Sequence, residues 1–185
     1  MGLLARWVVV LLAVLGGLPS PADRLAAQGI SAPELTAAFL FNFVKFTTWP
    51  DDVLGGGDPI VVCVGGSDGV AHALVQLTRN QRVNGHWLSI QRTNLDRPFD
   101  GCHVVYGAAL DGKRAQLLIR TTAGRPILTV SDSSDFAQRG GVANFFIDGD
   151  RMRFAVNPAA AVRARLRISS KLLTLAKVVR DDGGP

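Results

Sequence analysis

Three short apolar runs, separated by segments with helical patterns, most strongly constrain the fold of this chain. They lie at residues 60–64, 104–106 and 127–130 and contain almost no polar residues. Runs of this kind are typical of strands that are covered on both faces, as in parallel sheets. Helices are expected at 70–78 and 113–120, so the order strand, helix, strand recurs. The pattern predicts βαβ units and a partly parallel sheet.

The C-terminal third of the chain has a different pattern. Two strands are expected at 142–147 and 151–156, joined through Asp148-Gly149-Asp150, and an Asp-Gly pair between such runs indicates a hairpin. Asn157 followed by Pro158 is typical of a helix start, and Ser169 or Ser170 is expected to cap a last helix. The predicted fold is therefore a single compact α/β domain. Its mixed, largely parallel sheet is flanked by helices and followed by a C-terminal β-hairpin and two C-terminal helices.

A first helix is expected from Ser31 to about Thr47. The segment Ser31-Ala-Pro-Glu34 has the form of a capping box, and Trp49-Pro50 is expected to end the helix. Helical spacing places Asn42 on the same face as several apolar residues, so Asn42 is expected to be buried and hydrogen-bonded. Asn144 and Asn157 are also interpreted as internal hydrogen-bond anchors.

The N-terminal segment has the three regions of a secretory signal peptide. Residues 1–6 carry one positive charge, residues 7–18 are uncharged, and small residues follow. Cleavage is expected after Ala22 or Ala27, and Ala27 is preferred; the alternative is an uncleaved anchor. The predicted organisation is a signal peptide at 1–27, a domain at 28–179 and a disordered tail at 180–185.

The remaining 158 residues are enough for one domain with a full hydrophobic core. The formal net charge of the whole chain is +5, and the basic residues are scattered. A mild basic excess of this kind usually means a solvated surface, and export makes nucleic acid an unsuitable partner. After signal cleavage no apolar run reaches the length of about 20 residues that a membrane span needs.

The chain has two cysteines, Cys63 and Cys102, and both follow the expected cleavage site. An even number of cysteines in an oxidising compartment suggests a disulfide. Such a bond would close a loop of about 40 residues and contribute roughly 4 kcal/mol in the chain-entropy description. The alternative is two buried free thiols.

Few residues of the sequence have the type and spacing of a catalytic or metal-binding site. Gly65-Gly-Ser-Asp-Gly69 fits the G-x-S-x-G pattern of a nucleophile elbow, which leaves a hydrolase using Ser67 as a remote alternative. A structural turn capped by Asp68 explains the segment better. The three histidines have no metal-ligand spacing, and the segment 131–135 is expected to cap a helix rather than to bind Ca²⁺. The residues therefore favour a protein that is not an enzyme and has no metal or cofactor.

Five stretches of the chain, in order, resemble the YfiR-like family of periplasmic proteins. The resemblance covers residues 34–178. The stretches are Ala37-Ala-Phe-Leu-Phe-Asn-Phe-Val-Lys-Phe-Thr-Thr-Trp-Pro50, Cys102-His-Val-Val-Tyr106, Pro126-Ile-Leu-Thr-Val-Ser-Asp132, Gly140-Gly-Val-Ala-Asn-Phe145, and a C-terminal block from Met152-Arg-Phe-Ala-Val-Asn157 through Leu166-Arg-Ile-Ser-Ser-Lys-Leu-Leu-Thr-Leu-Ala176.

The resemblance implies a non-catalytic periplasmic repressor of a membrane-bound diguanylate cyclase. The repressor would bind the cyclase's periplasmic domain and so lower cyclic-di-GMP output and biofilm formation. An outer-membrane lipoprotein is a possible second partner, and a homodimer is possible. Cys63 and Cys102 match a cysteine pair of the family's repressor, whereas the repressor's second pair is missing here. Ala155 replaces a residue that is usually acidic in the family motif.

The C-terminal block is the expected contact surface for a partner or ligand. Its candidate residues are Phe154, Arg167, Ile168 and Leu172, with Trp49 as a further candidate. An apolar patch edged with charge is typical of a transient protein interface; the alternative is that the apolar members belong to the core. A well-formed apolar pocket by Trp49 and the C-terminal block would instead favour a small-molecule receptor that acts on another membrane sensor, such as a histidine kinase.

Overall fold

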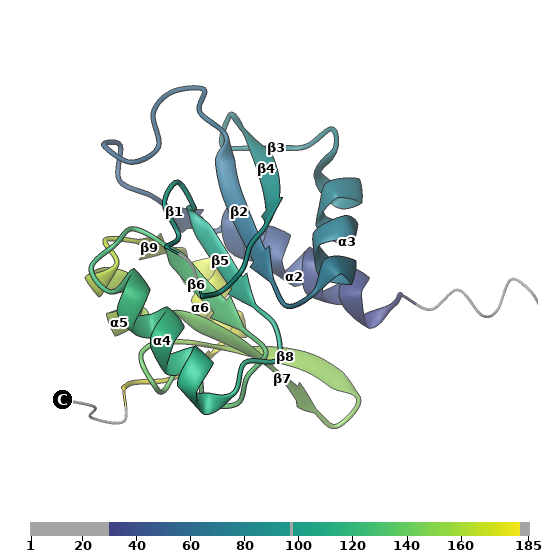
Figure 1. Cartoon of the computed structure of the whole chain (residues 1–185), viewed down its shortest axis with the longest axis vertical. Helices are drawn as coiled ribbons and strands as arrows, with labels where there is room; N and C mark the ends of the chain where they lie inside the picture. Colours follow the sequence, from purple (N-terminus) through teal and green to yellow (C-terminus); the bar gives the residue numbers. More distant parts are fainter. Residues whose placement is uncertain (1–29, 97, 182–185) are drawn as a thin grey trace, which may run out of the picture. The chain divides into compact units, whose positions relative to one another are not determined.

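The computed structural model describes residues 30–96 and 98–181. Residues 32–96 and 98–181 belong to one compact unit (Figure 1). Its helices are α2 (Ala32–Lys45), α3 (Asp68–Thr78), α4 (Gly112–Thr122), α5 (Pro158–Arg163) and α6 (Ser170–Leu175). Its strands are β1 (Thr47–Thr48), β2 (Ile60–Gly65), β3 (Arg82–Val83), β4 (His86–Arg92), β5 (Val104–Gly107), β6 (Leu128–Ser131), β7 (Ala143–Asp148), β8 (Arg151–Val156), β9 (Arg167–Ile168) and β10 (Lys177–Val178). The expected signal peptide lies outside the described residues.

Eight strands form a mixed sheet in the order β10-β8-β7-β6-β5-β2-β4-β3. The pairs from β4 through β2, β5 and β6 to β7 are parallel, as is the pair of β10 with β8. Only β3–β4 and β7–β8 are antiparallel within this sheet. Helix α3 connects β2 to the β3–β4 hairpin, and α4 connects β5 to β6. The predicted fold class is confirmed.

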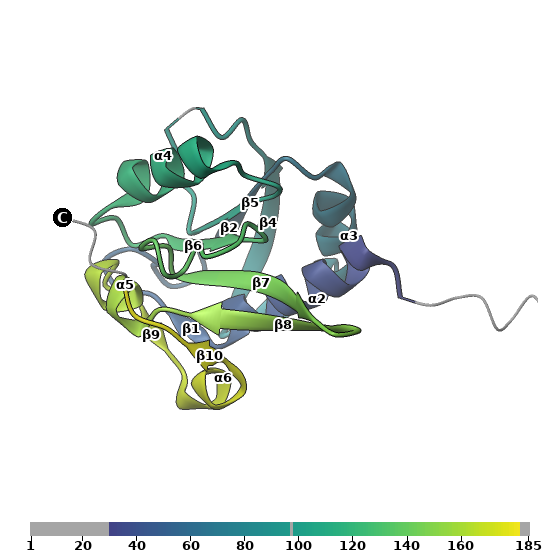
Figure 2. The same ribbon diagram turned by 90° about the horizontal axis from the view of Figure 1, so that it is seen from below.

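Both faces of the central strands are buried, which explains their continuous apolar sequence. Along β2, Val62 and Val64 belong to the core cluster that includes α2 and α3, whereas Cys63 belongs to the cluster under α4. These three side chains are at most 2% exposed. Figure 2 shows α4 on one side of the strands, with α2 and α3 apart from it.

The C-terminal hairpin has the register that its sequence indicates. Asp148 pairs with Arg151, so Gly149 and Asp150 form a two-residue turn between β7 and β8. Gly149 has φ +63°, a conformation that favours glycine and belongs to hairpin turns. Asn157 then caps α5 by accepting a hydrogen bond from the backbone N–H of Ala160 at 3.0 Å.

The two-residue strands were not predicted, and three of the four, β1, β9 and β10, exist only through a distant partner. Helix α2 ends at Lys45, before the predicted end at Thr47, since Thr47 and Thr48 pair with β9 in a separate two-stranded sheet. Strand β10 pairs with the end of β8. Residues 179–181 continue from β10, and Asp181 is hydrogen-bonded to Asn157, so the first residues of the expected tail are attached to the domain, and residues 182–185 lie outside the described residues.

Two predicted helix caps are wrong. Ser67, not Asp68, caps α3 by accepting a hydrogen bond from the N–H of Val70 at 3.3 Å. The segment 131–135 is not followed by a helix. Its Asp132 carboxylate instead accepts hydrogen bonds from the hydroxyl of Tyr106 at 3.1 Å and the N–H of Ala109 at 2.6 Å. The segment therefore connects the ends of β5 and β6.

Candidate interaction surface

The two cysteines form the expected disulfide. Cys63 lies in β2, Cys102 precedes β5, and their Cα atoms are 5.9 Å apart. Cys63 is 2% exposed and packs in the core cluster under α4. Because β2 and β5 are already neighbours in the sheet, the bond reinforces an existing strand pair rather than joining separate parts of the fold.

His103, which follows the disulfide, is a structural residue. Its Nδ1 accepts a hydrogen bond from the N–H of Val61 at 3.0 Å, so this nitrogen carries no proton. Burial lowers the pKa of His103 below its ordinary value, because the charged imidazolium is poorly solvated there. Burial and the accepted hydrogen bond thus both favour the neutral form of the ring, and Nδ1 is occupied by a backbone partner.

Three of the five residues expected at the contact surface lie in the core instead. Trp49, Phe154 and Leu172 are 5%, 6% and 4% exposed. Arg167 is exposed, and Ile168 is half-buried opposite Thr47 in the β1–β9 pair. Trp49 and Leu172 therefore do not form part of an exposed patch, because their side chains pack in the core, whereas Phe154, although largely buried, lines the hollow described next. Neither of the two hollows described below is lined by Trp49.

A hollow lined by apolar and arginine side chains nevertheless exists next to the C-terminal block. It has a volume of about 250 Å³ and lies between α2, β8 and α6. The residues that line it are Phe39, Arg151, Met152, Arg153, Phe154 and Leu175. We call these six residues the hairpin hollow. Leu175 is 74% exposed, and Ile147, which pairs with Met152 across the hairpin, is 67% exposed.

Aromatic rings pack beneath the hairpin hollow. Phe39 makes edge-to-face contacts with Phe145 and Phe154 at centroid distances of 5.7 and 5.9 Å. Phe43 contacts the same two rings at 5.6 and 5.2 Å. Edge-to-face pairs at these distances are favourable and hold the rings in defined orientations. The apolar floor of the hollow is thus rigidly supported by α2, β7 and β8.

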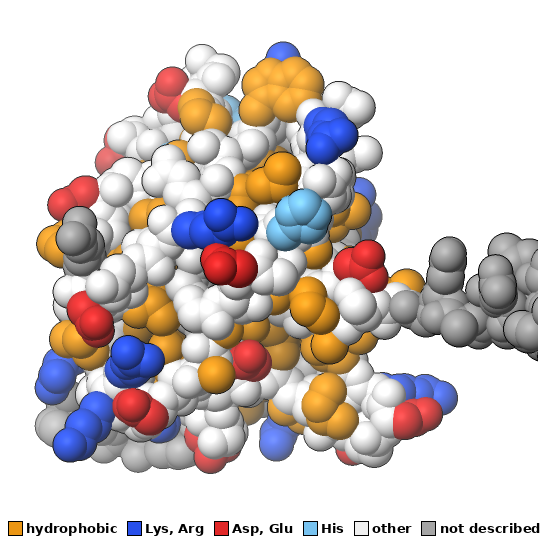
Figure 3. Space-filling view, turned by 45° about the vertical axis from the view of Figure 1, so that its right-hand side comes forward, with side chains coloured by type: hydrophobic (Ala, Val, Ile, Leu, Met, Phe, Trp, Pro, Cys, Tyr) orange, Lys and Arg blue, Asp and Glu red, His pale blue; other side chains and the backbone are white. Residues whose placement is uncertain are grey.

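Charged side chains surround the apolar surface at the hairpin. Arg153 forms an ion pair with Asp148 at 2.8 Å, and Arg151 approaches Asp150 at 3.7 Å. All four side chains are more than half exposed, so these pairs add little stability and remain available to a partner. Figure 3 shows apolar side chains gathered at the lower right, beside a mixed group of acidic and basic side chains.

Sequence reasoning missed most of the hairpin hollow. Phe39 and Met152 are half-buried and line the hollow, and neither was among the candidate contact residues. Ile147 and Leu175 are long apolar side chains at the ends of their elements, which is the one sequence signal that indicates exposure. Asn42 is also exposed, contrary to the prediction that it is buried, because the opposite side of α2 faces the core.

Asn144 and Asn157 hold one loop residue between them. Asn144 accepts a hydrogen bond from the N–H of Ala137 at 3.2 Å, and Asn157 donates one to the carbonyl oxygen of Ala137 at 2.8 Å. Both asparagines are at most 3% exposed. The loop before β7 is therefore attached to the start of α5 through paired, buried polar groups.

Two further candidates for chemistry have structural partners. Ser67 caps α3, and the Nδ1 atom of His86 lies 2.7 Å from the carbonyl oxygen of Asp58. Among residues 30–96 and 98–181, no three His, Cys, Asp or Glu side chains are grouped to hold a metal ion. In the same part of the chain, no helix is both long and apolar enough to cross a membrane.

The structure defines an α/β domain with one disulfide and a candidate interaction surface at the C-terminal hairpin. The family model described as YfiR/HmsC-like matches residues 33–177, and the chain belongs to this family. The resemblance seen in the five sequence stretches is thereby confirmed.

Solved structures show similarity at the level of the fold. A conserved domain protein from Vibrio cholerae O1 biovar El Tor is 12% identical with a TM-score of 0.50, over 80% of this chain and 60% of that one. The ABC domain from Streptococcus pneumonia, solved in complex with L-Trp, is 9% identical with a TM-score of 0.45, over 64% of this chain and 54% of that one. This chain thus spans less than two thirds of either protein.

Proposed function

We propose that this protein is an exported, non-catalytic regulator that binds the periplasmic domain of a membrane-bound diguanylate cyclase and represses it. Membership of the YfiR/HmsC-like family supports a periplasmic regulator of such cyclases. The observation that carries the proposal is the hairpin hollow, in which exposed apolar side chains lie on a rigid aromatic floor. Sequestration by an outer-membrane lipoprotein and formation of a homodimer would be further interactions of the same domain.

The hairpin hollow has the composition of a small protein interface. Leu175 in the hollow and Ile147 beside it, opposite Met152, present apolar surface that water solvates poorly, and Arg151 and Arg153 edge it with charge. Interfaces commonly combine such an apolar centre with a charged rim, and arginine is enriched among residues that contribute strongly to binding. A volume of about 250 Å³ is below the range of roughly 300–1,000 Å³ that is usual for small-molecule sites. The hollow therefore suits an inserted side chain of a partner protein better than a whole ligand.

Binding to the cyclase tests the proposal directly. Tagged protein would be captured from crosslinked membranes and its partners identified by mass spectrometry, and the affinity for the cyclase's purified periplasmic domain would then be measured. Leu175→Asp places a charge in the apolar centre and is expected to weaken binding about tenfold or more. Val162→Asp is the matched control, because Val162 is 72% exposed on α5, outside the hollow.

Repression is tested by cyclic-di-GMP production from the membrane-embedded cyclase. The wild-type protein and Val162→Asp are expected to lower the rate, and Leu175→Asp is expected to leave it high. The proposal fails if the wild-type protein neither captures nor inhibits a membrane diguanylate cyclase. If both variants lose binding equally, the hairpin hollow is not the contact surface.

A further inference from the structure

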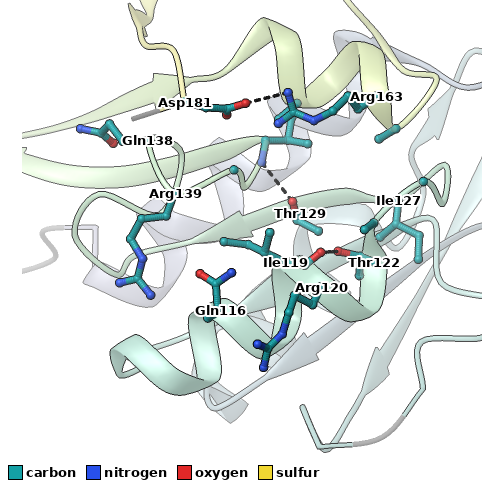
Figure 4. A pocket seen from close by; sticks show the side chains of 16 residues that line it. Gln116, Ile119, Arg120, Thr122, Ile127, Thr129, Gln138, Arg139, Arg163 and Asp181 are labelled. Atoms are coloured by element: carbon teal, nitrogen blue, oxygen red, sulfur yellow. Dashed lines mark hydrogen bonds and ion pairs between the residues drawn. The ribbon is translucent and has the colours of Figure 1, made fainter. Parts of the chain in front are cut away.

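A second, larger hollow lies away from the hairpin, between α4, the 134–140 loop and α5. Its volume is about 830 Å³, which is within the usual range for small-molecule sites. Figure 4 shows the side chains around it, with Gln116 and Arg120 on the α4 side and Gln138 and Asp181 on the opposite side. We call it the α4 cavity.

The floor of the α4 cavity is apolar and well ordered. Ile127, Val142 and Ala160 line it and are at most 4% exposed. The hydroxyl of Thr129, itself 4% exposed, accepts a hydrogen bond from the N–H of Val142 at 3.0 Å. This bond attaches the start of β7 to β6 and leaves the backbone donor of Val142 satisfied. The floor therefore offers apolar contact to the body of a ligand.

The rim of the α4 cavity carries an excess of positive charge. Three arginines line it, from α4, the 134–140 loop and α5. Arg163 is neutralised by an ion pair with Asp181 at 2.7 Å. Arg139 donates to the carbonyl oxygen of Gly112 at 2.6 Å, which leaves its charge uncompensated. In residues 30–96 and 98–181, the guanidinium of Arg120 has neither an ion pair nor a hydrogen bond. Two cationic groups thus remain for an anion.

An unused hydrogen-bond acceptor lies at the other side of the cavity. Gln138 donates through Nε2 to the carboxylate of Asp135 at 3.2 Å. Its Oε1 is the one buried side-chain oxygen or nitrogen without a hydrogen-bond partner in the described part of the chain. An unsatisfied buried acceptor is unfavourable, and native structures contain few of them. A donor group on a ligand would remove this deficit.

We propose that the α4 cavity binds a small organic anion with an apolar body and a hydrogen-bond donor distant from its anionic group. The anionic group lies by Arg120 and Arg139, the body lies on the floor, and the donor meets Gln138 Oε1. Inorganic phosphate alone is a poorer occupant, because it leaves the apolar floor uncovered. This site is separate from the hairpin hollow and does not depend on the identity of the protein partner.

Calorimetric titration of the purified protein with naphthoate tests the anionic and apolar requirements together. Naphthamide, a neutral analogue of the same shape, is the matched ligand and is expected to bind at least about tenfold more weakly. Arg120→Gln and Arg139→Gln each remove one charge from an exposed side chain and are expected to weaken naphthoate binding about tenfold. Arg79→Gln removes the same charge from an exposed position at the end of α3 and is expected to change nothing.

Hydroxynaphthoates test the donor requirement. At least one isomer is expected to bind the wild-type protein more tightly than naphthoate and to lose this advantage in Gln138→Leu. Circular dichroism would verify that each variant is folded. The proposal is overturned if naphthoate does not bind at millimolar concentration, or if naphthamide binds equally well. It is also overturned if Arg79→Gln weakens binding as much as Arg120→Gln does.

Discussion

The indole Nε1–H of Trp49 donates a hydrogen bond of 3.2 Å to the backbone carbonyl oxygen of His103. The two rings also meet edge to face, with centroids 6.5 Å apart. The same carbonyl accepts a second hydrogen bond from the N–H of Leu128 at 2.9 Å. The segment after α2 is thus attached to the residue that follows the disulfide, and this contact explains why Trp49 is buried rather than available at the surface.

Replacement of this tryptophan is expected to destabilise the fold. Trp49→Phe removes the hydrogen bond and part of a side chain that is 5% exposed, so the free energy of unfolding should fall by about 1–3 kcal/mol. Urea denaturation followed by circular dichroism measures the change. Trp87→Phe is the control, because Trp87 is 44% exposed, and its effect should be within about 0.5 kcal/mol. Equal effects of the two substitutions would refute the structural role of Trp49.

Loss of the disulfide is expected to lower the stability substantially. The Cys63→Ala/Cys102→Ala variant removes a bond between residues separated by 39 positions, and the free energy of unfolding should fall by about 2–5 kcal/mol. Denaturation in the presence and absence of a reducing agent measures this contribution. Reduction should destabilise the wild-type protein to a similar extent and leave the variant unchanged. A reducing agent that affects both proteins equally would contradict the prediction.

Tyr106 is expected to resist ionisation as long as the protein is folded. Burial, and then the Asp132 carboxylate, raise the pKa of Tyr106 above its ordinary value of 10.0. Because the pKa of Tyr106 is higher in the folded than in the unfolded protein, the neutral hydroxyl contributes to the free energy of unfolding. This contribution is fully present below pH 10.0 and is lost as the pH rises further. Tyr106 is the only tyrosine in the chain, so tyrosinate absorbance reports on it alone.

Alkaline titration therefore distinguishes two outcomes for Tyr106. In the folded protein the tyrosinate signal should appear only together with loss of secondary structure, whereas in urea it should appear near the ordinary pKa. A reversible titration near pH 10.0 in the folded protein would show that the hydroxyl is not held as described.

The C-terminal segment is expected to open at low pH. A hydrogen-bonded ion pair with Arg163 lowers the pKa of Asp181 below its ordinary value of 3.8, and a hydrogen bond from Asn157 acts in the same direction. The ionised carboxylate therefore favours the attached segment. The stabilisation of the attached segment by the Asp181 carboxylate is complete above pH 3.8. It is lost as the pH falls through the lowered pKa that Asp181 has in the folded protein.

Amide hydrogen exchange measures this opening. The N–H of Val179 donates to the carbonyl oxygen of Val156 at 2.9 Å, so its protection reports on the attachment of β10. After correction for intrinsic exchange, protection should fall in acid in the wild-type protein. Asp181→Asn should show the low protection at every pH. Protection of Val179 in the variant that matches the wild-type protein at neutral pH would argue against the role of Asp181.

Elements with local sequence signals were predicted well. The apolar runs at β2, β5 and β6, the Gly149 turn and the Asn157 cap depend on residues that are adjacent or nearly so. Their conformational preferences act over a few residues and agree with the final fold. The cysteine pair was also predicted, because the count and the expected compartment were sufficient.

Elements defined by distant partners were not predicted. Strands β1, β9 and β10 have two residues each and exist only through pairing with segments far away in the chain. The role of the 131–135 segment depends on Tyr106 and Ala109, which arrive from the neighbouring strand end. No local sequence pattern predicts these contacts, because the order of the strands in the sheet determines which segments become hydrogen-bond partners.

By itself, the sequence determined the α/β class, the parallel strands, the disulfide and the family of this protein. Hydrophobic periodicity, turn residues and motifs depend on residues that are close together in the chain, so they can be recognised without the structure. Only the tertiary structure decided which apolar residues reach the surface. Phe154 and Leu172 are covered, whereas Leu175 and Ile147 are exposed, although all four are apolar. The physical reason is that the burial of a side chain depends on which elements pack against it. The same packing brings together residues that are distant in the chain, and so forms the hairpin hollow and the α4 cavity.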